Sequence, residues 1–462
     1  MHAVADRPVN RGILLAVILI SSFFNPFMGS AVNIALPSIG KDLAMTAVAM
    51  SWIPMGFLLL AAVMLVPFGK LADIVGRRKM LLWGNVGFAG ATLLCGFATS
   101  SALLIGARCL QGAGSAMILS SGMAIVISAF PAEKRGAIIG LNTTAVYVGL
   151  SAAPLLGGLL TQSLGWQSLF FINAAVGLLV VAGIAWGVRA EWAEARDDRF
   201  DVTGSLVYIA SMSMLMYGFS QLPGRLAVVL TLAGSAGLVY FVALELRSAV
   251  PVLDMKLFRD NRIFAYSNLA ALINYAATFG ITFLLSLYLQ SVKGLSPRDA
   301  GMIMLTQPAT MAVVAAISGR LSDRIEPRIL SSLGMAVIVA GLVLLAFLST
   351  TTREPYVVVT LLILGFGFGL FSSPNTNAVM SSVEQRFLGT ASATLGTMRL
   401  TGQMFSMAIA AMVIHIFIGD AAIAAANIAS FMHSVRVTFT VFAALCLLGV
   451  FASLARGGRS AA

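Results

Sequence analysis

The chain contains fourteen runs of apolar residues, most of them roughly 19 to 25 residues long. A helix needs about 20 residues to cross a hydrocarbon core of about 30 Å, and a helix satisfies its own backbone hydrogen bonds in lipid. With 59% apolar and 10% charged residues, the chain is too apolar for a soluble domain. We therefore predict an all-α membrane protein with spans near 13–37, 50–69, 80–98, 102–128, 137–160, 167–188, 203–221, 226–246, 264–290, 300–318, 330–349, 356–376, 388–418 and 434–455.

The basic residues are distributed unevenly over these spans. If the N-terminus is cytoplasmic, 21 of the 29 Lys and Arg lie on the cytoplasmic side, six lie outside, and two, Arg108 and Arg399, lie within spans. Cytoplasmic loops of membrane proteins carry such an excess. The net charge of +11 therefore reports topology and not a nucleic-acid surface, and both termini are expected in the cytoplasm.

Neither the first span nor the cysteines indicate a secreted, disulfide-linked or metal-binding protein. The first span follows two arginines, as a signal peptide would, but it is too long for that role and shows no clear cleavage site. Cys95, Cys109 and Cys446 fall in apolar spans, which gives neither a disulfide framework nor metal-ligand spacing. No phosphate-binding loop of the form GxxxxGK[ST] occurs, so we expect no ATP, metal or cofactor.

A charged motif occurs twice. "GKLADIVGRRK" begins at Gly69 and "GRLSDRIEPR" begins at Gly319, 250 residues later, and an acidic and a basic residue at positions 133 and 135 recur at an offset of 251. Eight spans separate these equivalents, where duplication of a six-helix unit would separate them by six. We therefore predict a six-helix half at 1–188, linkers and two inserted helices at 189–262, and a second six-helix half at 263–462. The linker "RAEWAEARDDRFD" from Arg189 is expected to be a cytoplasmic surface segment.

Three further motifs accompany this repeat. "NIALPSI" begins at Asn33, "LLIGARCLQGAG" at Leu103 and "GLNTTAVYVGLSAAPLLGG" at Gly140. In this order and on these spans, the motifs resemble those of the major facilitator superfamily and, within it, of the fourteen-helix drug:proton antiporter family. The resemblance covers essentially the whole chain and implies two six-helix halves around a central cavity, plus two inserted helices.

The resemblance implies a conformational latch at the cytoplasmic rim of each half. The two glycines of the first copy permit a tight turn, Asp73 can face a helix N-terminus or an arginine, and the basic residues after it are expected to meet the anionic inner leaflet. If these charges only fixed topology, an Asp at the same place in both copies would be unexplained. The latch residues are Gly69, Asp73, Gly76, Arg77, Arg78, Gly319, Asp323 and Arg324.

The span at 137–160 resembles the antiporter motif of the same family. Its small residues allow another helix to approach closely, and its proline weakens the local hydrogen-bond ladder so that the helix can bend. The resemblance implies that this helix seals the outer side against a helix of the other half, with ordinary small-residue packing as the alternative. The residues are Gly140, Gly149, Pro154, Gly157 and Gly158.

Two arginines and several polar residues are predicted to line the central cavity. Arg108 lies about 9 Å inside its span, where partial snorkelling is possible, whereas Arg399 lies about 16 Å from either surface and needs partners. Each polar residue has an alternative role in interhelical packing. The predicted cavity, substrate or coupling residues are Asn25, Met28, Asn33, Arg108, Gln111, Asn142, Tyr147, Asn274, Tyr275, Gln307, Asn375, Arg399 and Gln403.

One position departs from the family pattern. Members commonly carry an Asp five residues before the Asn of "NIALP", a carboxylate offered to protons and cationic drugs, and this chain has Met28 there. No Asp or Glu falls in the middle of a predicted span. Because a cation in a dry cavity needs a carboxylate or an aromatic cage, the two arginines favour anionic or neutral amphipathic solutes.

We therefore expect a secondary transporter, not an enzyme, in a bacterial or archaeal cytoplasmic (inner) membrane. It is expected to export amphipathic drugs or metabolites by alternating access, with proton coupling implied by the resemblance. A facilitator or exchanger of one organic anion or neutral metabolite is the second candidate, and a receptor or structural membrane protein is the third. Expected partners are lipid, a small amphipathic substrate and protons, without nucleic acid; the chain is expected to be a monomer, with a periplasmic adaptor left open.

Overall fold

The computed structural model describes residues 10–193, 200–247, 256–322, 324–384, 388–419 and 421–456. Within these ranges the chain is helical and forms no β-sheet. One predicted latch residue, Asp323, lies outside the described residues. The helices are α1 (Arg11–Asp42), α2 (Ala47–Val75), α3 (Arg77–Gly96), α4 (Ser101–Ala129), α5 (Ala132–Leu164), α6 (Gln167–Gly187), α7 (Val202–Ser220), α8 (Arg225–Arg247), α9 (Lys256–Asp260), α10 (Arg262–Thr278), α11 (Gly280–Leu287), the π-helix η1 (Tyr288–Val292), α12 (Pro297–Met304), α13 (Thr306–Leu321), α14 (Pro327–Ala346), α15 (Glu354–Ser381), α16 (Leu388–Ile418), the 3₁₀-helix η3 (Ala425–Asn427) and α17 (Ile428–Ala455).

Thirteen helical segments of the described ranges are long and apolar enough to cross a membrane. Two of them join shorter helices: α10, α11 and η1 run on as Arg262–Val292, and α12 and α13 run on as Pro297–Leu321. The predicted span at 80–98 lies in α3, which is not among the thirteen. This helix begins with three basic residues, yet it packs lengthwise against α4 and α6 as a spanning helix does.

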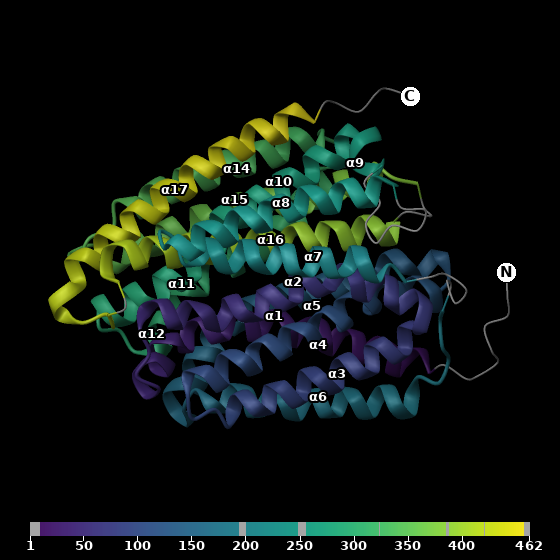
Figure 1. Ribbon diagram of the computed structural model, residues 1–462, viewed down its shortest axis with the longest axis horizontal. Helices are drawn as coiled ribbons and strands as arrows, with labels where there is room; N and C mark the ends of the chain where they lie inside the picture. Colours follow the sequence, from purple (N-terminus) through teal and green to yellow (C-terminus); the bar gives the residue numbers. More distant parts are fainter. Residues whose placement is uncertain are drawn as a thin grey trace.

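The long helices form two groups, which Figure 1 shows one above the other. In the lower group, α1 packs against α5 and α6, while α3 and α2 both pack against α4. In the upper group, α10 packs against α16 and α17, and α15 packs against α13 and α14. The start of α1 and the end of α17 lie toward the same side of the molecule, on the right in Figure 1, which we call the inner end; the opposite side is the outer end.

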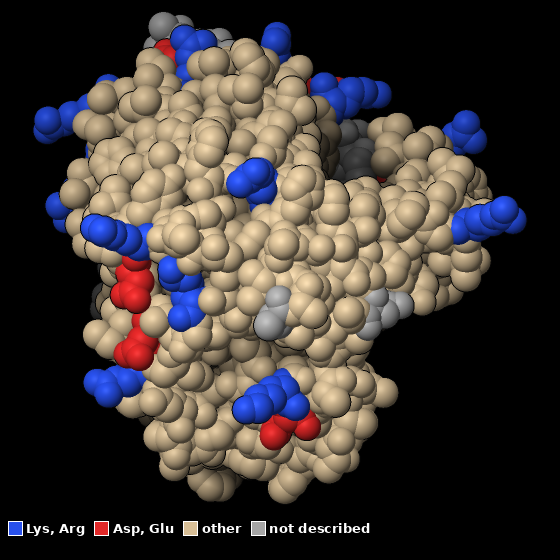
Figure 2. Space-filling view, turned by 90° about the vertical axis from the view of Figure 1, so that its left-hand side faces the viewer, with Lys and Arg blue, Asp and Glu red and all other residues tan. Residues whose placement is uncertain are grey.

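Helices α7 and α8 form a hairpin beside the seam between the two groups. Helix α7 packs against α2 of the lower group and α16 of the upper group, with ring centroids 5.6 Å apart for Trp52 and Tyr217 and 5.9 Å apart for Phe219 and Phe405. Helix α8 packs mainly on α7 and exposes large apolar side chains such as Val239. Figure 2 views the outer end, where charged side chains are scattered over a mostly uncharged surface.

The local sequence explains where several helices begin and end. Asn10 caps α1 by accepting hydrogen bonds from two backbone N–H groups of its first turn, as capping asparagines do. Helix α2 ends at Val75 because Gly76 adopts a φ of 122°, which favours glycine. The prediction that Gly69 also serves this turn is wrong, because Gly69 lies inside α2 and faces Ser120 of α4.

Candidate functional site

Side chains from both groups meet around Arg399, eleven residues after the first residue of α16. The Arg399 guanidinium carbon lies 5.2 Å from the ring centroid of Tyr275 on α10, which allows a cation–π interaction, and Tyr275 packs edge-on against Phe368 of α15 at 5.6 Å. Across the seam, Tyr147 of α5 shares a hydrogen bond of 2.7 Å with Ser372 of α15. Tyr147 also lies within electrostatic range of Tyr275 and Arg399. We call these five residues the Arg399 cluster.

Polar groups in and beside the Arg399 cluster lack partners. The Arg399 Nε is buried and has no hydrogen bond. Asn274 is fully buried, and neither its Nδ2 nor its Oδ1 has a hydrogen-bond partner. Gln307 of α13 is 9% exposed, and Gln403 lies one turn after Arg399 on α16. No Asp or Glu forms an ion pair with Arg399 in the part of the chain that the structure describes. The cluster therefore presents hydrogen-bond donors and aromatic faces, which suit neutral or anionic aromatic groups.

The two groups are in backbone contact at the outer end. A side chain at Gly158 of α5 would collide with the carbonyl oxygen of Pro297, the first residue of α12, and a side chain at Gly301 of α12 would collide with the carbonyl oxygen of Pro154. Glycine is required where backbones approach this closely. The antiporter motif thus lies against a helix of the other group, and this contact closes the outer end between α5 and α12.

A second outer contact joins α1 to the span that contains α11. The Nδ2 of Asn33 donates to Thr282 Oγ1 at 3.2 Å, and the Nε2 of Gln290 donates to the carbonyl oxygen of Ile34 at 2.9 Å. Asn33 is 1% exposed. It therefore lies in the outer contact and not in the Arg399 cluster.

The remaining glycines of the antiporter motif differ among themselves. Gly149 lies against the backbone of Phe23 and Gly157 against Ala31, so both allow α5 to approach α1 within the lower group. Gly140 has nothing within 4 Å of the place where a side chain would begin. Close packing in this conformation therefore explains Gly149, Gly157 and Gly158 but not Gly140.

The inner turn between α2 and α3, which we call the first corner, is built around Arg77. Its Nη2 lies 2.8 Å from Asp73 Oδ1, and its Nη1 donates to Ser128 Oγ at 2.8 Å. Asp73 therefore faces an arginine, which was one of its two predicted partners. The expectation that Arg77 meets the inner leaflet is wrong, since Arg77 is only 9% exposed.

The chain after α6 folds back onto the first corner. Backbone N–H groups at the start of α3 donate to it: Arg77 N to the Trp192 carbonyl oxygen and Arg78 N to Glu191 Oε1, both at 2.8 Å. The Arg78 side chain donates to the carbonyl oxygen of Val188. Because no side chain of its own turn caps α3, the Glu191 carboxylate satisfies a free N–H there. The linker was expected to be a surface segment, but Trp192 is buried at 6% exposure.

The inner turn between α13 and α14, the second corner, is different. Gly319 lies inside α13 and faces Ser373 of α15, as Gly69 faces α4 in the first corner. Arg324 is exposed, and Arg328 Nε lies 2.6 Å from Glu326 Oε2. Asp323, the counterpart of Asp73, lies outside the described residues.

A buried arginine at the end of α17 joins four helices beside the second corner. Arg456 is 2% exposed; its Nη1 donates to Asn375 Oδ1 at 3.1 Å and to Ser267 Oγ at 3.2 Å. Its Nη2 donates to the carbonyl oxygen of Pro327 at 3.0 Å and to Ser453 Oγ at 3.1 Å. Burial lowers the pKa of Arg456 to about 10, so the guanidinium remains charged at neutral pH. Asn375 therefore holds this arginine and does not join the Arg399 cluster.

Arg108 lies inside the lower group, away from the seam. It is 1% exposed, its guanidinium lies 4.5 Å from the Phe57 ring centroid, and its Nε donates to the carbonyl oxygen of Ile53 at 3.2 Å. Gln111 accepts from Nη1 and donates to Thr92 Oγ1. The expected partial snorkelling of Arg108 is therefore wrong, because α2 and α3 enclose the side chain on both sides.

The other predicted cavity residues are dispersed. Asn142 of α5 accepts a hydrogen bond of 2.6 Å from Ser22 Oγ, and Asn25 of α1 donates to Ser115 Oγ at 2.7 Å. Met28 is 1% exposed and packs in the core. The structure thus brings together Tyr147, Tyr275 and Arg399. Asn274 directly precedes Tyr275 on α10, and Gln403 lies one turn after Arg399 on α16. The predicted residues with partners in other places are Asn25, Met28, Asn33, Arg108, Gln111, Asn142 and Asn375.

Several residues of these sites were not predicted. Phe368 and Ser372 complete the Arg399 cluster, and the apolar and hydroxyl composition of α15 gives no local signal for either. Glu191 and Trp192 lie in a charged linker. A tryptophan among acidic and basic residues is the one signal there that this part of the linker could be buried. Arg456 was counted with the cytoplasmic charges, because it follows the last apolar run directly.

Comparison with known proteins agrees with this architecture. The family model described as Major Facilitator Superfamily matches residues 18–407. The chain is 30% identical over 391 residues to the riboflavin transporter RibZ of Clostridioides difficile (strain 630), with 84% of each chain covered. It is 32% identical over 384 residues to the multidrug resistance protein Stp of Mycobacterium tuberculosis (strain CDC 1551 / Oshkosh), covering 82% of this chain and 71% of that one.

Two solved structures share the fold. A bacterial homologue of the human lysosomal transporter Spinster, inward-facing and unoccupied, superposes with a TM-score of 0.68 at 19% identity, covering 99% of this chain and 100% of that one. The human organic anion transporter MFSD10 superposes with a TM-score of 0.64 at 15% identity, covering 97% and 100%.

Proposed function

Because the chain belongs to the major facilitator superfamily, we propose that it exports neutral or anionic aromatic molecules from the cytoplasm by alternating access of its two halves. It is a multi-pass transporter of the cytoplasmic membrane and not an enzyme. The proposed topology has fourteen spans, with α3 as the fourteenth, and both termini in the cytoplasm, which the distribution of Lys and Arg supports. The proposed units are the halves at 1–188 and 263–462 and the inserted segment at 189–262, in a chain that acts as a monomer.

The Arg399 cluster carries the proposal for the substrate. It combines a guanidinium with a free Nε, two tyrosines and a phenylalanine, and it draws on both halves through the Tyr147–Ser372 hydrogen bond. A ligand bound here touches both halves, so its binding can bias the rocking between them. Donors without a carboxylate favour oxygen-rich or anionic aromatic ligands over cations.

Riboflavin is a suitable first probe for this site. It is uncharged at neutral pH, planar and aromatic, and rich in carbonyl and hydroxyl groups, which fits the donors and rings of the Arg399 cluster. The similarity to a riboflavin transporter supports the choice of probe, while the similarity to a multidrug resistance protein supports a broader range of aromatic substrates.

A second candidate function is a facilitator or exchanger that is not driven by protons. Met28 stands at the usual acidic position and is buried in the core, and no Asp or Glu pairs with Arg399 among the described residues. Proton coupling, which the family resemblance implies, would then need a titratable group elsewhere in the chain.

Transport by purified protein in liposomes tests both candidates. Riboflavin, one anionic and one cationic amphipathic probe are each measured with and without an imposed pH gradient, for the parent, for Arg399→Ala and for the exposed control Arg436→Ala. We expect the neutral and anionic probes to move, and Arg399→Ala to lose at least about tenfold of this transport while the control retains it. If only the cationic probe moved, and only with a pH gradient, the proposed substrate class would be overturned. If the neutral and anionic probes moved equally well without a gradient, the second candidate, a facilitator or exchanger, would be favoured.

A further inference from the structure

Two side-chain amides cross the outer end in opposite directions. The Nδ2 of Asn33 on α1 donates to Thr282 Oγ1 of α11 at 3.2 Å, and the Nε2 of Gln290 on η1 donates to the carbonyl oxygen of Ile34 at 2.9 Å. Asn33 is 1% exposed and Ile34 is fully buried, so α1 places both hydrogen bonds away from water. We call Asn33, Ile34, Thr282 and Gln290 the amide clasp.

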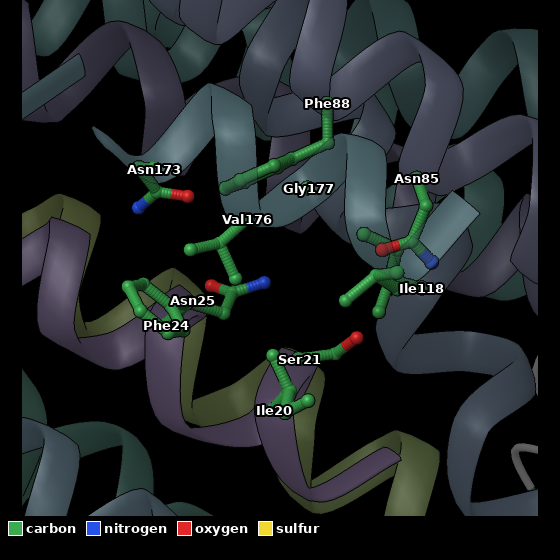
Figure 3. Close-up of a pocket in the computed structure, with 11 residues that line it drawn as sticks. Ile20, Ser21, Phe24, Asn25, Asn85, Phe88, Ile118, Asn173, Val176 and Gly177 are labelled. Atoms are coloured by element: carbon green, nitrogen blue, oxygen red, sulfur yellow. The ribbon is translucent and has the colours of Figure 1, made fainter. Parts of the chain in front are cut away.

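Asn33 bonds to a different group of helices from the asparagine nearer the middle of α1. Figure 3 shows Asn25 inside the lower group, in the lining of a small space to which Asn85 of α3 and Asn173 of α6 also contribute. Asn25 donates to Ser115 Oγ of the same group at 2.7 Å. Asn33 lies eight residues farther along α1, or about 12 Å, and bonds to the upper group. The amide clasp is therefore a contact between the two halves and not packing within one of them.

The π-helix η1 places Gln290 in the amide clasp. The N–H of Lys293 donates to the carbonyl oxygen of Tyr288, five residues earlier, at 3.0 Å, and such π-helical turns are rare and often lie at functional sites. Gln290 Nε2 also donates to Ser286 Oγ at 3.1 Å. Because Ser286 lies four residues earlier on the same span, this second bond fixes the direction of the amide.

The shared fold of the two halves does not require these amides. At the repeat offset of 250, Gln290 corresponds to Gly40 of α1, which has no side chain to donate a hydrogen bond, and α1 continues there as an α-helix. In the same way, Asn33 corresponds to Phe283 of α11, which is fully buried in the hydrophobic core. The amides are therefore particular to the place where α1 meets α11 and η1.

The closed amide clasp leaves acceptors without partners. Asn33 Oδ1 is buried and has no hydrogen bond. Pro37, inside α1, has no N–H to offer the carbonyl oxygen of Asn33. Buried acceptors without partners cost free energy, and water can reach them when the outer end opens. The two hydrogen bonds of the clasp are thus partly offset, which suits a contact that has to break in every transport cycle.

We propose that Gln290 is a positioning residue of the transport cycle: with Asn33, it sets the balance between the conformations in which the outer end is closed and open. The inference rests on the proposed alternating access of the two halves, and it does not depend on which molecule is transported. The contact between α5 and α12 provides the close fit of the backbones, whereas the amide clasp provides the directional bonds that are made on closing and lost on opening.

Distances between spin labels across the outer end, at the exposed Leu164 and Phe347, test the proposal without substrate. Gln290→Met keeps the length of the side chain and removes its donor, and Gln162→Met, at an exposed glutamine near the outer end of α5, is the control. We expect Gln290→Met to raise the ratio of long to short distances about fivefold, as the loss of one hydrogen bond does, and the control to leave it unchanged. A ratio equal to that of the parent in folded Gln290→Met would overturn the proposal.

Gln290→Glu separates the hydrogen bond from packing. The side chain keeps its size, but a carboxylate cannot donate to the carbonyl oxygen of Ile34, whereas a protonated carboxyl group can. Relative to the parent at the same pH, we expect Gln290→Glu to favour long distances at about pH 8 and to approach the parent at about pH 5. A Gln290→Glu variant that matches the parent at about pH 8 would show that packing, and not the hydrogen bond, is what Gln290 contributes.

Transport and thermal unfolding complete the test. We expect Gln290→Met to lower the maximal rate of riboflavin transport in liposomes about fivefold, because the balance between conformations limits the cycle, with the control unchanged. A lower Tm together with unchanged outer distances would assign Gln290 to packing and refute the proposal. If the parent does not transport riboflavin, the proposed substrate fails, and the distances, measured without substrate, still decide the role of Gln290.

Discussion

In the lower group, the residues that follow α6 form hydrogen bonds with the start of α3. In the upper group, the residue that follows α17 forms a hydrogen bond with the start of α14, but the chemical groups involved differ. In the first corner, Glu191 and Trp192, which follow α6, accept hydrogen bonds from the backbone at the start of α3. In the second corner, Arg456, which follows α17, donates to the Pro327 carbonyl oxygen at the start of α14. The corresponding helix ends are thus joined by a carboxylate in one half and by a guanidinium in the other.

The two corners also differ in how far their charged groups are exposed. In the first corner the Asp73 side chain is 37% exposed, so water can solvate its carboxylate when Asp73 separates from the buried Arg77. Arg456 is 2% exposed and donates four hydrogen bonds to groups on α10, α14, α15 and its own helix. We infer that the first corner rearranges during transport, whereas the Arg456 site holds the upper half rigid.

The largest effect is expected at the rigid site. Arg456→Leu removes four hydrogen bonds and leaves Asn375 Oδ1 without a partner, so we expect a loss of about 2 to 4 kcal/mol in stability. Thermal unfolding of the purified protein measures it, with the exposed Arg436→Leu as the control. An unchanged Tm for Arg456→Leu would show that this site does not hold the upper half together.

The first corner is expected to affect transport more than stability. Asp73→Asn removes the ion pair between the partly exposed Asp73 carboxylate and the buried Arg77, which keeps its hydrogen bond to Ser128 Oγ. We therefore expect a loss of stability of about 1 kcal/mol. We expect transport to fall about five- to tenfold, because the balance between conformations depends on this pair. Liposome transport and the amount of inserted protein are measured together, and full activity would remove Asp73 from the latch.

Glu191 allows a finer test of the same corner. Glu191→Ala leaves the start of α3 without its acceptor and should cost about 1 kcal/mol, as the loss of a helix cap does. Glu191→Gln keeps an oxygen acceptor and loses only the charge, so it should recover about half of that loss. Thermal unfolding compares the two variants, and equal losses for both would show that charge, not the hydrogen bond, is what Glu191 contributes.

The smallest effect is expected for the exposed ion pair of the second corner. Glu326 and Arg328 are each 38% exposed at their side chains, and such pairs contribute about 0 to 1 kcal/mol. Glu326→Gln should therefore change Tm and transport very little. A transport loss as large as that of Asp73→Asn would mean that both corners act as latches and do not differ in this respect.

The features that could be predicted are those that a short stretch of sequence determines: the helices, the two corners and some close contacts between helices. Apolar runs located the helices, and the 250-residue repeat located both corners. The glycines at positions 149, 157 and 158 indicated close contacts between helices, because glycine leaves room for a neighbouring backbone and can be recognised in the sequence itself. Hydropathy alone does not identify α3 as a spanning helix. Its first three residues are basic, yet the helix packs against its neighbours as the spans do.

Contacts between distant segments were not predictable from the sequence. Arg108 and Arg399 are both arginines within apolar runs, yet α2 and α3 enclose Arg108 while Arg399 faces Tyr275. Arg456 follows an apolar run directly, as many exposed cytoplasmic arginines do, and only the packing of α10, α14 and α15 around it buries the side chain. Neither the direction of a side chain nor the identity of its distant neighbours is contained in hydropathy or spacing.

The most direct test of the account asks whether closing one end opens the other. Distances between spin labels are measured across the inner corners, at the exposed Val75 and Ile325, and across the outer end, at the exposed Leu164 and Phe347. Gly158→Trp prevents α5 from closing onto Pro297, whereas Gly140→Trp on the same helix has open space and is the control. We expect Gly158→Trp to lengthen the outer distance and to shorten the inner one, with both distances unchanged in the control. A longer outer distance with an unchanged inner distance would contradict alternating access between these two halves.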